Sequence, residues 1–313
     1  MTLARALELA AAASGRAYPK PTVGAVVARD GEILGEGVTE AGGRHGEVVA
    51  LDEAGDRARG ATLYATMEPC AHWGTTPPCT ERIVAEGIAR VVVASRDPNP
   101  EAAGGLERLA AAGVDVELID SFEARRQNEA WRTWVSAGRP FVTYKVATTL
   151  DGRVTVPGER WVTGEASRRL VHELRAAADA VAVGMGTVRA DDPSLEAREV
   201  PTPRGQPRRL AFGRGPLPAG SPLELRSGPL ADELRALAGE GVQSLLLEGG
   251  PTLAAAFLEA DLVDKLLVFV APTLAGEGPI AFPARLASPR PVRHLSARAV
   301  GDDVLLEAYV HEL

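Results

Sequence analysis

The 313-residue chain lacks several features that mark other classes of protein. Two cysteines, Cys70 and Cys79, are too few for a disulfide-dense secreted scaffold. No uncharged stretch reaches the ~18 residues of a membrane span. The 34 basic residues are outnumbered by 42 acidic ones, and a net charge of −8 repels phosphate backbones. Arg5 and Glu8 interrupt the N-terminal alanines, which indicates an amphipathic helix rather than a signal peptide. We therefore expect a cytoplasmic protein with neither nucleic-acid nor membrane partners.

What is present predicts two α/β domains. The length exceeds what one compact domain usually needs, and strand and helix signals alternate throughout. Gly138-Arg139-Pro140 precedes a new apolar strand, so we expect domains at residues 1–138 and 139–313. In the first we expect strands at 22–28, 33–38, 61–66, 90–95 and 114–118 and helices at 47–60, 106–112 and 122–134, with a further helix between the third and fourth strands. In the second we expect strands at 141–147, 180–184, 242–247, 266–270 and 304–310, helices at 167–178, 231–238 and 252–259, and little regular structure at 196–229.

One histidine, two cysteines and a glutamate suggest a metal site. His45-Gly46-Glu47 opens a predicted helix, Pro69-Cys70 follows a strand, and Cys79 comes nine positions after Cys70. One imidazole and two thiolates suit tetrahedral zinc and leave a fourth position for water. Glu47 can take a proton from that water and deliver it to a leaving amine. This combination is typical of zinc-dependent nucleobase deaminases.

Two simpler interpretations compete with a catalytic zinc. Cysteines in a reducing compartment are often inert core residues, and a single histidine is more often a surface residue. A structural zinc site would want a fourth Cys or His at close spacing; His72 is near, but four protein ligands would leave no place for water. We favour a catalytic zinc, because His45, Glu47 and both cysteines occur together.

The wider pattern resembles the bifunctional riboflavin-biosynthesis proteins over nearly the whole chain. In the first half the similarity lies in Pro69-Cys70-Ala71-His72-Trp73-Gly74-Thr75-Thr76-Pro77-Pro78-Cys79 and Asp97-Pro98-Asn99-Pro100. In the second half it lies in Lys145, Leu150-Asp151-Gly152-Arg153, Trp161-Val162-Thr163, Asp191-Asp192-Pro193 and Glu248-Gly249-Gly250-Pro251-Thr252-Leu253. The resemblance implies a cytidine-deaminase-like three-layer domain followed by a dihydrofolate-reductase-like domain.

The resemblance also implies two consecutive reactions on a small phosphorylated pyrimidine. The first domain would hydrolyse an amino group from a phosphoribosyl-diaminopyrimidine, and the second would reduce the ribosyl group to ribityl with NADPH. His45, Cys70 and Cys79 would hold Zn²⁺, with Glu47 as the catalytic proton shuttle. The implied cofactor contacts are Ala147, Trp161, Thr187, Asp191, Gly250, Pro251, Thr252, Leu253, Ala254, Ala255 and Ala256. The implied substrate contacts are Arg175, Leu195, Arg198 and Glu248. A homodimer is compatible with this family.

Local chemistry supports the second site less specifically. Gly249-Gly250 lies between a buried strand and a helix, where bare amides can receive a pyrophosphate, although such turns often serve only tight packing. Arg175 and Arg198 can form charge-assisted bonds to a phosphate, although most arginines here would be solvated.

The chain departs from the family pattern at several positions. Tyr18-Pro19-Lys20-Pro21-Thr22 replaces a His-Pro-Asn-Pro-Asn segment, Gly46 replaces alanine, Thr75 replaces a cation, and Glu159 replaces a serine. Because the cation at Thr75 is lost, we predict that Lys20 contacts the substrate phosphate of the first domain. The segment 210–230 is also shorter than usual by about one strand.

The arginines in or beside that shortened segment are candidates for binding the 2′-phosphate of NADPH. They are Arg204, Arg208, Arg209 and Arg214. We predict that Arg208 and Arg209 together favour NADPH over NADH, because discrimination needs a cation near that phosphate.

Two other functions remain open from the sequence. One is a deaminase of another nucleobase or of tRNA whose second domain is remodelled and inactive. The acidic charge argues against tRNA. The other is a zinc-stabilised regulatory protein, against which Glu47 argues, because a structural zinc has no use for an adjacent carboxylate.

Overall fold

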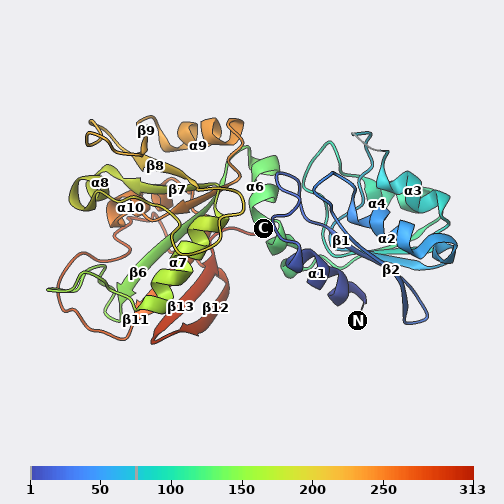
Figure 1. The fold of residues 1–313 in the computed structure, drawn as a ribbon, viewed down its shortest axis with the longest axis horizontal. Helices are drawn as coiled ribbons and strands as arrows, with labels where there is room; N and C mark the ends of the chain where they lie inside the picture. The colour runs from blue at the N-terminus through green and yellow to red at the C-terminus, as the bar shows by residue number, and fades with distance from the viewer. Residues whose placement is uncertain (1, 75–76) are drawn as a thin grey trace. The chain divides into compact units, whose positions relative to one another are not determined.

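A computed structural model describes residues 2–74 and 77–313 of the chain. It divides into two compact units, Met1–Ala137, with which Leu313 is grouped, and Gly138–Glu312 (Figure 1). Thr75, where we expect a lost phosphate contact, lies outside the described residues. No helix in the described ranges is long and apolar enough to cross a membrane.

The first unit is built on a five-stranded sheet of order β2-β1-β3-β4-β5. β1 (Gly24–Arg29) and β2 (Glu32–Val38) form an antiparallel hairpin, and β1 also pairs antiparallel with β3 (Thr62–Ala65). β3, β4 (Arg90–Val93) and β5 (Asp115–Leu118) are parallel. Asp30 and Gly31 both adopt positive φ at the hairpin turn, as a tight two-residue connection requires.

Helices cover both faces of this sheet and make three layers. α2 (Gly46–Ala54), the 3-10 helix η1 (Gly55–Ala58), α3 (Cys79–Ala85) and α4 (Gly105–Ala111) contribute to the larger core cluster. α1 (Thr2–Ala12) packs against the opposite face.

The helix expected at 122–134 is instead two helices, α5 (Phe122–Gln127) and α6 (Glu129–Ala137). Asn128 separates them, and its side-chain amide bonds both the N–H and the C=O of Thr22, each at 2.9 Å. These long-range side-chain bonds anchor the segment before β1, while the Asn128 backbone keeps its local bonds to Arg125 and Arg132.

The second unit has an eight-stranded sheet of order β12-β13-β11-β6-β10-β7-β8-β9. The parallel part contains β6 (Phe141–Thr149), β7 (Ala180–Gly184), β8 (Arg208–Phe212), β9 (Glu224–Arg226), β10 (Ser244–Leu247) and β11 (Lys265–Ala271). β12 (Arg293–Val300) and β13 (Asp303–Tyr309) add an antiparallel hairpin at one edge.

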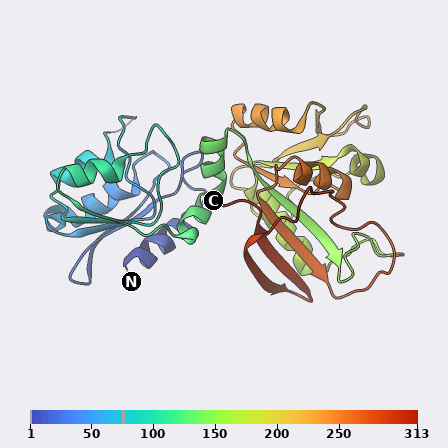
Figure 2. The same cartoon turned by 180° about the vertical axis from the view of Figure 1, so that it is seen from behind.

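Helices again lie on both faces of the sheet. α7 (Glu165–Ala177) lies in front of the sheet in Figure 1, whereas α10 (Pro251–Glu259) lies in front of it in Figure 2. α8 (Met185–Asp191) follows β7, and α9 (Leu230–Gly239) shares a core cluster with α10. The α/β class predicted for both domains and the three layers predicted for the first are confirmed.

Three parts of the second unit differ from the sequence expectation, and the first is α8, since no helix was expected at Met185–Asp191. Residues 196–229 contain β8 and β9, which hydrophobic patterning missed because β8 opens with two arginines and β9 has three residues. β12 was also missed, since seven of its eight residues are exposed and it lacks alternating burial.

Candidate active sites

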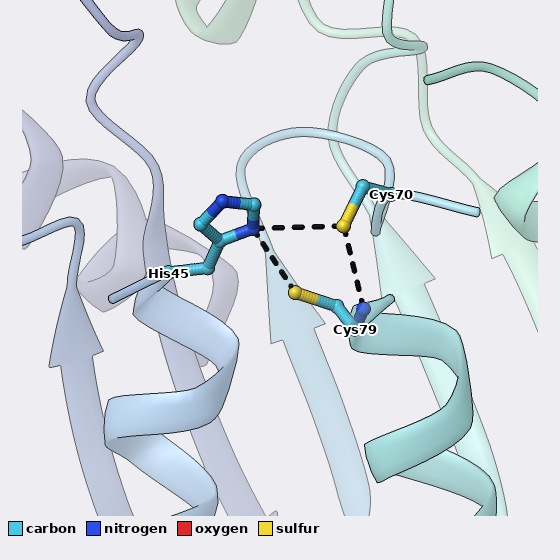
Figure 3. Close-up of side chains that lie close together, drawn as sticks. All are labelled: His45, Cys70 and Cys79. Carbon is cyan, nitrogen blue, oxygen red and sulfur yellow. Dashed lines mark hydrogen bonds between the residues drawn. The ribbon is translucent and has the colours of Figure 1, made fainter. Parts of the chain in front are cut away.

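His45, Cys70 and Cys79 converge in the first unit. His45 caps α2, Cys70 follows the strand β3, and Cys79 is the first residue of α3. The His45 Nδ1 lies 3.1 Å from the Cys79 Sγ and 3.6 Å from the Cys70 Sγ (Figure 3). The Cys79 backbone N–H also points at the Cys70 Sγ, at 3.3 Å. Three elements far apart in sequence therefore present three donor atoms to one point.

The spacing of these atoms suits zinc. All three donor atoms lie within 4.8 Å of one another. Tetrahedral zinc, with metal–sulfur bonds of about 2.3 Å and metal–nitrogen bonds of about 2.0 Å, places its ligand atoms roughly 3.5–3.8 Å apart. The Cys79 side chain, and then the His45 ring, lower the pKa of the Cys70 thiol. A readily ionised thiol beside an imidazole is the donor chemistry that zinc prefers.

Glu47 lies beside these donors. It is the second residue of α2, its exposed fraction is 3%, and its Oε2 has no hydrogen-bond partner among the described residues. Burial raises the pKa of this carboxyl to about 7. A carboxyl with such a pKa can both accept and release a proton near neutrality.

A cavity of about 320 Å³ opens onto His45, Glu47 and Cys70. Asp97 and Asn99 also line it, from the segment between β4 and α4. Buried Glu68 holds this segment, since its carboxylate accepts bonds from the backbone N–H of Leu106 at 3.0 Å and of Asp97 at 3.2 Å.

Sequence reasoning gave no role to Glu68, Asp97 or Asn99. The sequence does contain a signal that could have indicated them. Acidic and amide side chains follow two buried parallel strands, at the carboxyl ends where such sheets place functional groups. Desolvation raises the pKa of the Asp97 carboxyl to about 6, as expected for a carboxyl that faces a small cavity.

Lys20 is the only lysine or arginine among the described residues that line this cavity. Lys20 is exposed in the segment before β1. Its Nζ lies close to Gly43, 3.0 Å from the position that a Cβ on this glycine would take. Thr22, in contrast, is buried and its backbone is bonded to Asn128.

A second cavity, of about 410 Å³, lies in the second unit. Buried Glu248 organises it: Arg175 donates two bonds to its carboxylate, at 2.6 and 3.0 Å, and the Lys145 Nζ lies 3.8 Å away. Trp161 lines the cavity and is 54% exposed, with Arg160 and Arg168 near its ring at 5.0 and 5.5 Å. The cavity is therefore lined by several cationic side chains and by an accessible indole ring.

Most residues that the resemblance implied for the second site line this cavity. They are Ala147, Trp161, Thr187, Asp191, Gly250, Pro251, Arg175, Arg198 and Glu248. Six others do not line it: Leu195, Thr252, Leu253, Ala254, Ala255 and Ala256. Leu195 and Ala254 belong to the core, with exposed fractions of 2% and 0%.

The Gly249-Gly250 turn brings backbone close to the cavity. A Cβ on Gly249 would lie 2.9 Å from the Leu253 Cδ2, and one on Gly250 would lie 3.4 Å from the Thr187 Oγ1. Bare glycine backbone thus lies at the start of α10, a shape that fits a pyrophosphate.

Arg208 and Arg209 lie elsewhere, contrary to our expectation. They open β8, whereas the second cavity uses residues at and beyond the carboxyl ends of β10 and β7. Arg208 is paired with Glu224 at 2.6 Å and Glu240 at 2.7 Å. Both arginines are paired with carboxylates, Arg209 with Glu196 at 3.1 Å, and both lie at the amino end of β8, so the structure does not support them as the 2′-phosphate contact.

Comparison with known proteins gives the same two-part division. Residues 1–95 match the cytidine and deoxycytidylate deaminase zinc-binding region, and residues 140–217 and 227–306 match the RibD C-terminal domain. A riboflavin biosynthesis protein RibD of Aquifex aeolicus is 42% identical over 87% of this chain and 86% of its own. The Escherichia coli RibD is 37% identical over 97% of both chains. The solved Acinetobacter baumannii RibD has a TM-score of 0.84 and 35% identity, covering 98% of this chain and 97% of its own.

Fold, site and matches together define an enzyme with a zinc-binding deaminase domain and an NADPH-using reductase domain. The chain belongs to the RibD family of riboflavin-biosynthesis proteins. The family resemblance expected from the sequence is confirmed, and so are the two cofactors, zinc and NADPH.

Proposed function

We propose that this chain deaminates 2,5-diamino-6-(5-phosphoribosylamino)pyrimidin-4(3H)-one and then reduces the ribosyl side chain of the product to ribityl. The observation on which this rests is the cluster of His45, Cys70 and Cys79 beside Glu47, at a cavity of about 320 Å³ that His45, Glu47 and Cys70 line. A cavity of this size admits a small heterocycle.

In the first reaction, His45, Cys70 and Cys79 would hold zinc. When bound, zinc would act as a Lewis acid that lowers the pKa of water toward neutrality. Glu47 takes a proton from the attacking water and passes it to the amino group, so that ammonia leaves as the ring carbonyl forms. The unpartnered Glu47 Oε2 supports this role, since a buried carboxylate oxygen without a partner is costly in a purely structural position.

In the second reaction, bound NADPH supplies the hydride. We assign the cofactor to Ala147, Trp161, Thr187, Asp191 and the turn at Gly250, and the substrate to Arg175, Arg198 and Glu248. The Arg175 charge is already largely matched by Glu248. The Arg198 side chain has no partner among the described residues, so Arg198 is better placed to bind phosphate.

Two features weigh against the alternatives left open by the sequence. A tRNA deaminase would need basic surface, yet Lys20 is the single lysine or arginine among the described residues lining the first cavity. A regulatory zinc protein would have no use for the unpartnered Glu47 or for the second cavity.

The proposal includes a cytoplasmic location, because zinc ligation needs Cys70 and Cys79 as reduced thiols. A homodimer remains a prediction that sedimentation velocity can test. The central experiment supplies purified protein with the diaminopyrimidine phosphate and follows ammonia release, then NADPH oxidation. Ammonia release without NADPH oxidation would leave only the deaminase half of the proposal standing.

A further inference from the structure

Arg214 occupies a different position from the other arginines of its segment. It follows β8 directly, in a loop whose flanking residues Gly213 and Gly215 have φ of 135° and 100°. Arg208 and Arg209 open the same strand. Arg208 and Phe212 are four residue steps apart along the strand, about 13 Å at 3.3 Å per residue. Arg214 therefore lies beyond the carboxyl ends of the parallel strands, whereas Arg208 and Arg209 lie at their amino ends.

The loop that bears Arg214 is held against α8. A Cβ on Gly213 would come within 3.0 Å of the Met185 side chain, so only glycine permits this approach. The Arg189 Nη2 donates to the Arg214 carbonyl oxygen at 2.8 Å. Arg189 also lies 2.9 Å from where a Cβ on Gly215 would stand. Packing and a hydrogen bond thus fix the backbone from which the Arg214 side chain projects.

In the described ranges neither Arg214 nor Arg189 has a carboxylate partner, and both residues are exposed. Arg204, in contrast, is paired with Asp179 at 2.9 Å, and Arg209 with Glu196 at 3.1 Å. Two neighbouring cations without an acidic partner leave a positive charge for a ligand to match.

The strand order places this charge along the path of a dinucleotide. The parallel strands run in the order β6-β10-β7-β8. In the proposed site, Ala147 of β6 contacts the nicotinamide end and Gly250 after β10 receives the pyrophosphate. Continuing in the same direction crosses β7 and reaches β8, two strand spacings or about 10 Å beyond β10. Dinucleotides bind across the carboxyl ends of parallel strands, so the adenosine end would reach Arg214.

We propose that Arg214, positioned by Arg189, binds the 2′-phosphate of NADPH and sets the preference for NADPH over NADH. The inference rests on the proposed placement of the cofactor. It replaces Arg208 and Arg209 in that role. A guanidinium on a loop at a strand end presents paired N–H donors to phosphate oxygens, which suits a terminal phosphomonoester.

Calorimetric titration of the full-length protein with NADP⁺, NAD⁺, 2′,5′-ADP and 5′-AMP tests this without any turnover. In the wild type we expect NADP⁺ to bind more tightly than NAD⁺, and 2′,5′-ADP more tightly than 5′-AMP. In Arg214→Ala we expect NADP⁺ and 2′,5′-ADP binding to weaken about ten- to a hundredfold, the usual scale of a charge-assisted bond. NAD⁺ and 5′-AMP binding should stay unchanged, and Arg214→Lys should keep part of the discrimination.

Arg208→Ala is the matched control, because it removes a cation from the other end of the same strand. It should leave both affinity ratios at their wild-type values. Full discrimination in Arg214→Ala, or its loss in Arg208→Ala, would overturn the inference while the cofactor site stands. Wild-type protein that binds neither dinucleotide would refute the cofactor placement itself, and the inference with it.

Discussion

Replacing Lys20 by alanine tests how this chain holds the phosphate of its deaminase substrate. Among the described residues, Lys20 is the only lysine or arginine that lines the first cavity, and its ammonium makes no ion pair with them. Hydrogen bonds to charged groups contribute about 1.5–3 kcal/mol. Because Lys20 is exposed and solvent screens its charge, the lower end applies, ~1.5 kcal/mol, which is roughly a tenfold change in affinity.

The assay compares the Michaelis constants of ammonia release for the phosphorylated substrate and for its dephosphorylated form. In Lys20→Ala we expect the constant for the phosphorylated substrate to rise about tenfold, with kcat little changed, because phosphate binding is equal in ground and transition states. The constant for the dephosphorylated form should stay the same. Lys20→Arg should restore most of the affinity.

Arg16→Ala is the control for general charge. Arg16 is an exposed cation four positions earlier that does not line the cavity. It should leave both constants unchanged. Equal effects of Lys20→Ala on the two substrates would refute the reasoning and make Lys20 a solvated loop residue.

Three further predictions follow from the two units. Glu47→Gln should keep zinc but lower deamination by about two orders of magnitude or more, while NADPH oxidation on the deaminated intermediate is unchanged; equal loss of both activities would contradict separate sites. Cys79→Ser should lower the zinc content found by metal analysis and the melting temperature of the first unit, since metal binding contributes to folding; full zinc retention would remove Cys79 from the ligands. The third concerns His311, which lies 2.9 Å from a carboxylate oxygen of each of Asp264 and Asp261, and Asp264 and then Asp261 raise its pKa. Its stabilisation is complete below the unfolded pKa of about 6.5 and is lost as pH rises through the higher folded pKa. His311→Gln should therefore lower the free energy of unfolding by up to ~1 kcal/mol at pH 6 and by less at pH 9, which thermal melts at the two pH values measure. A larger loss at pH 9 than at pH 6 would exclude this ion pair.

The deaminase site was largely readable from the chain. His45 and Glu47 are two residues apart at one helix start, and Cys70 and Cys79 flank a short loop, so spacing alone indicates their chemistry. Most strands of both sheets were also predictable, since buried parallel strands are short apolar runs. β8, β9 and β12 were not, because charged or exposed residues dominate them and their pairing depends on neighbouring strands.

The sequence by itself determined which residue types could bind zinc, that the chain holds two α/β units, and which family it resembles. Only the tertiary structure decided which cations are free to bind phosphate. Arg208, Arg209 and Arg214 lie within seven positions of one another, yet strand β8 separates them to opposite edges of the sheet. An extended strand holds its two ends far apart. The ion pairs that occupy Arg208 involve Glu224 and Glu240, which are distant in sequence and meet it only in the folded chain.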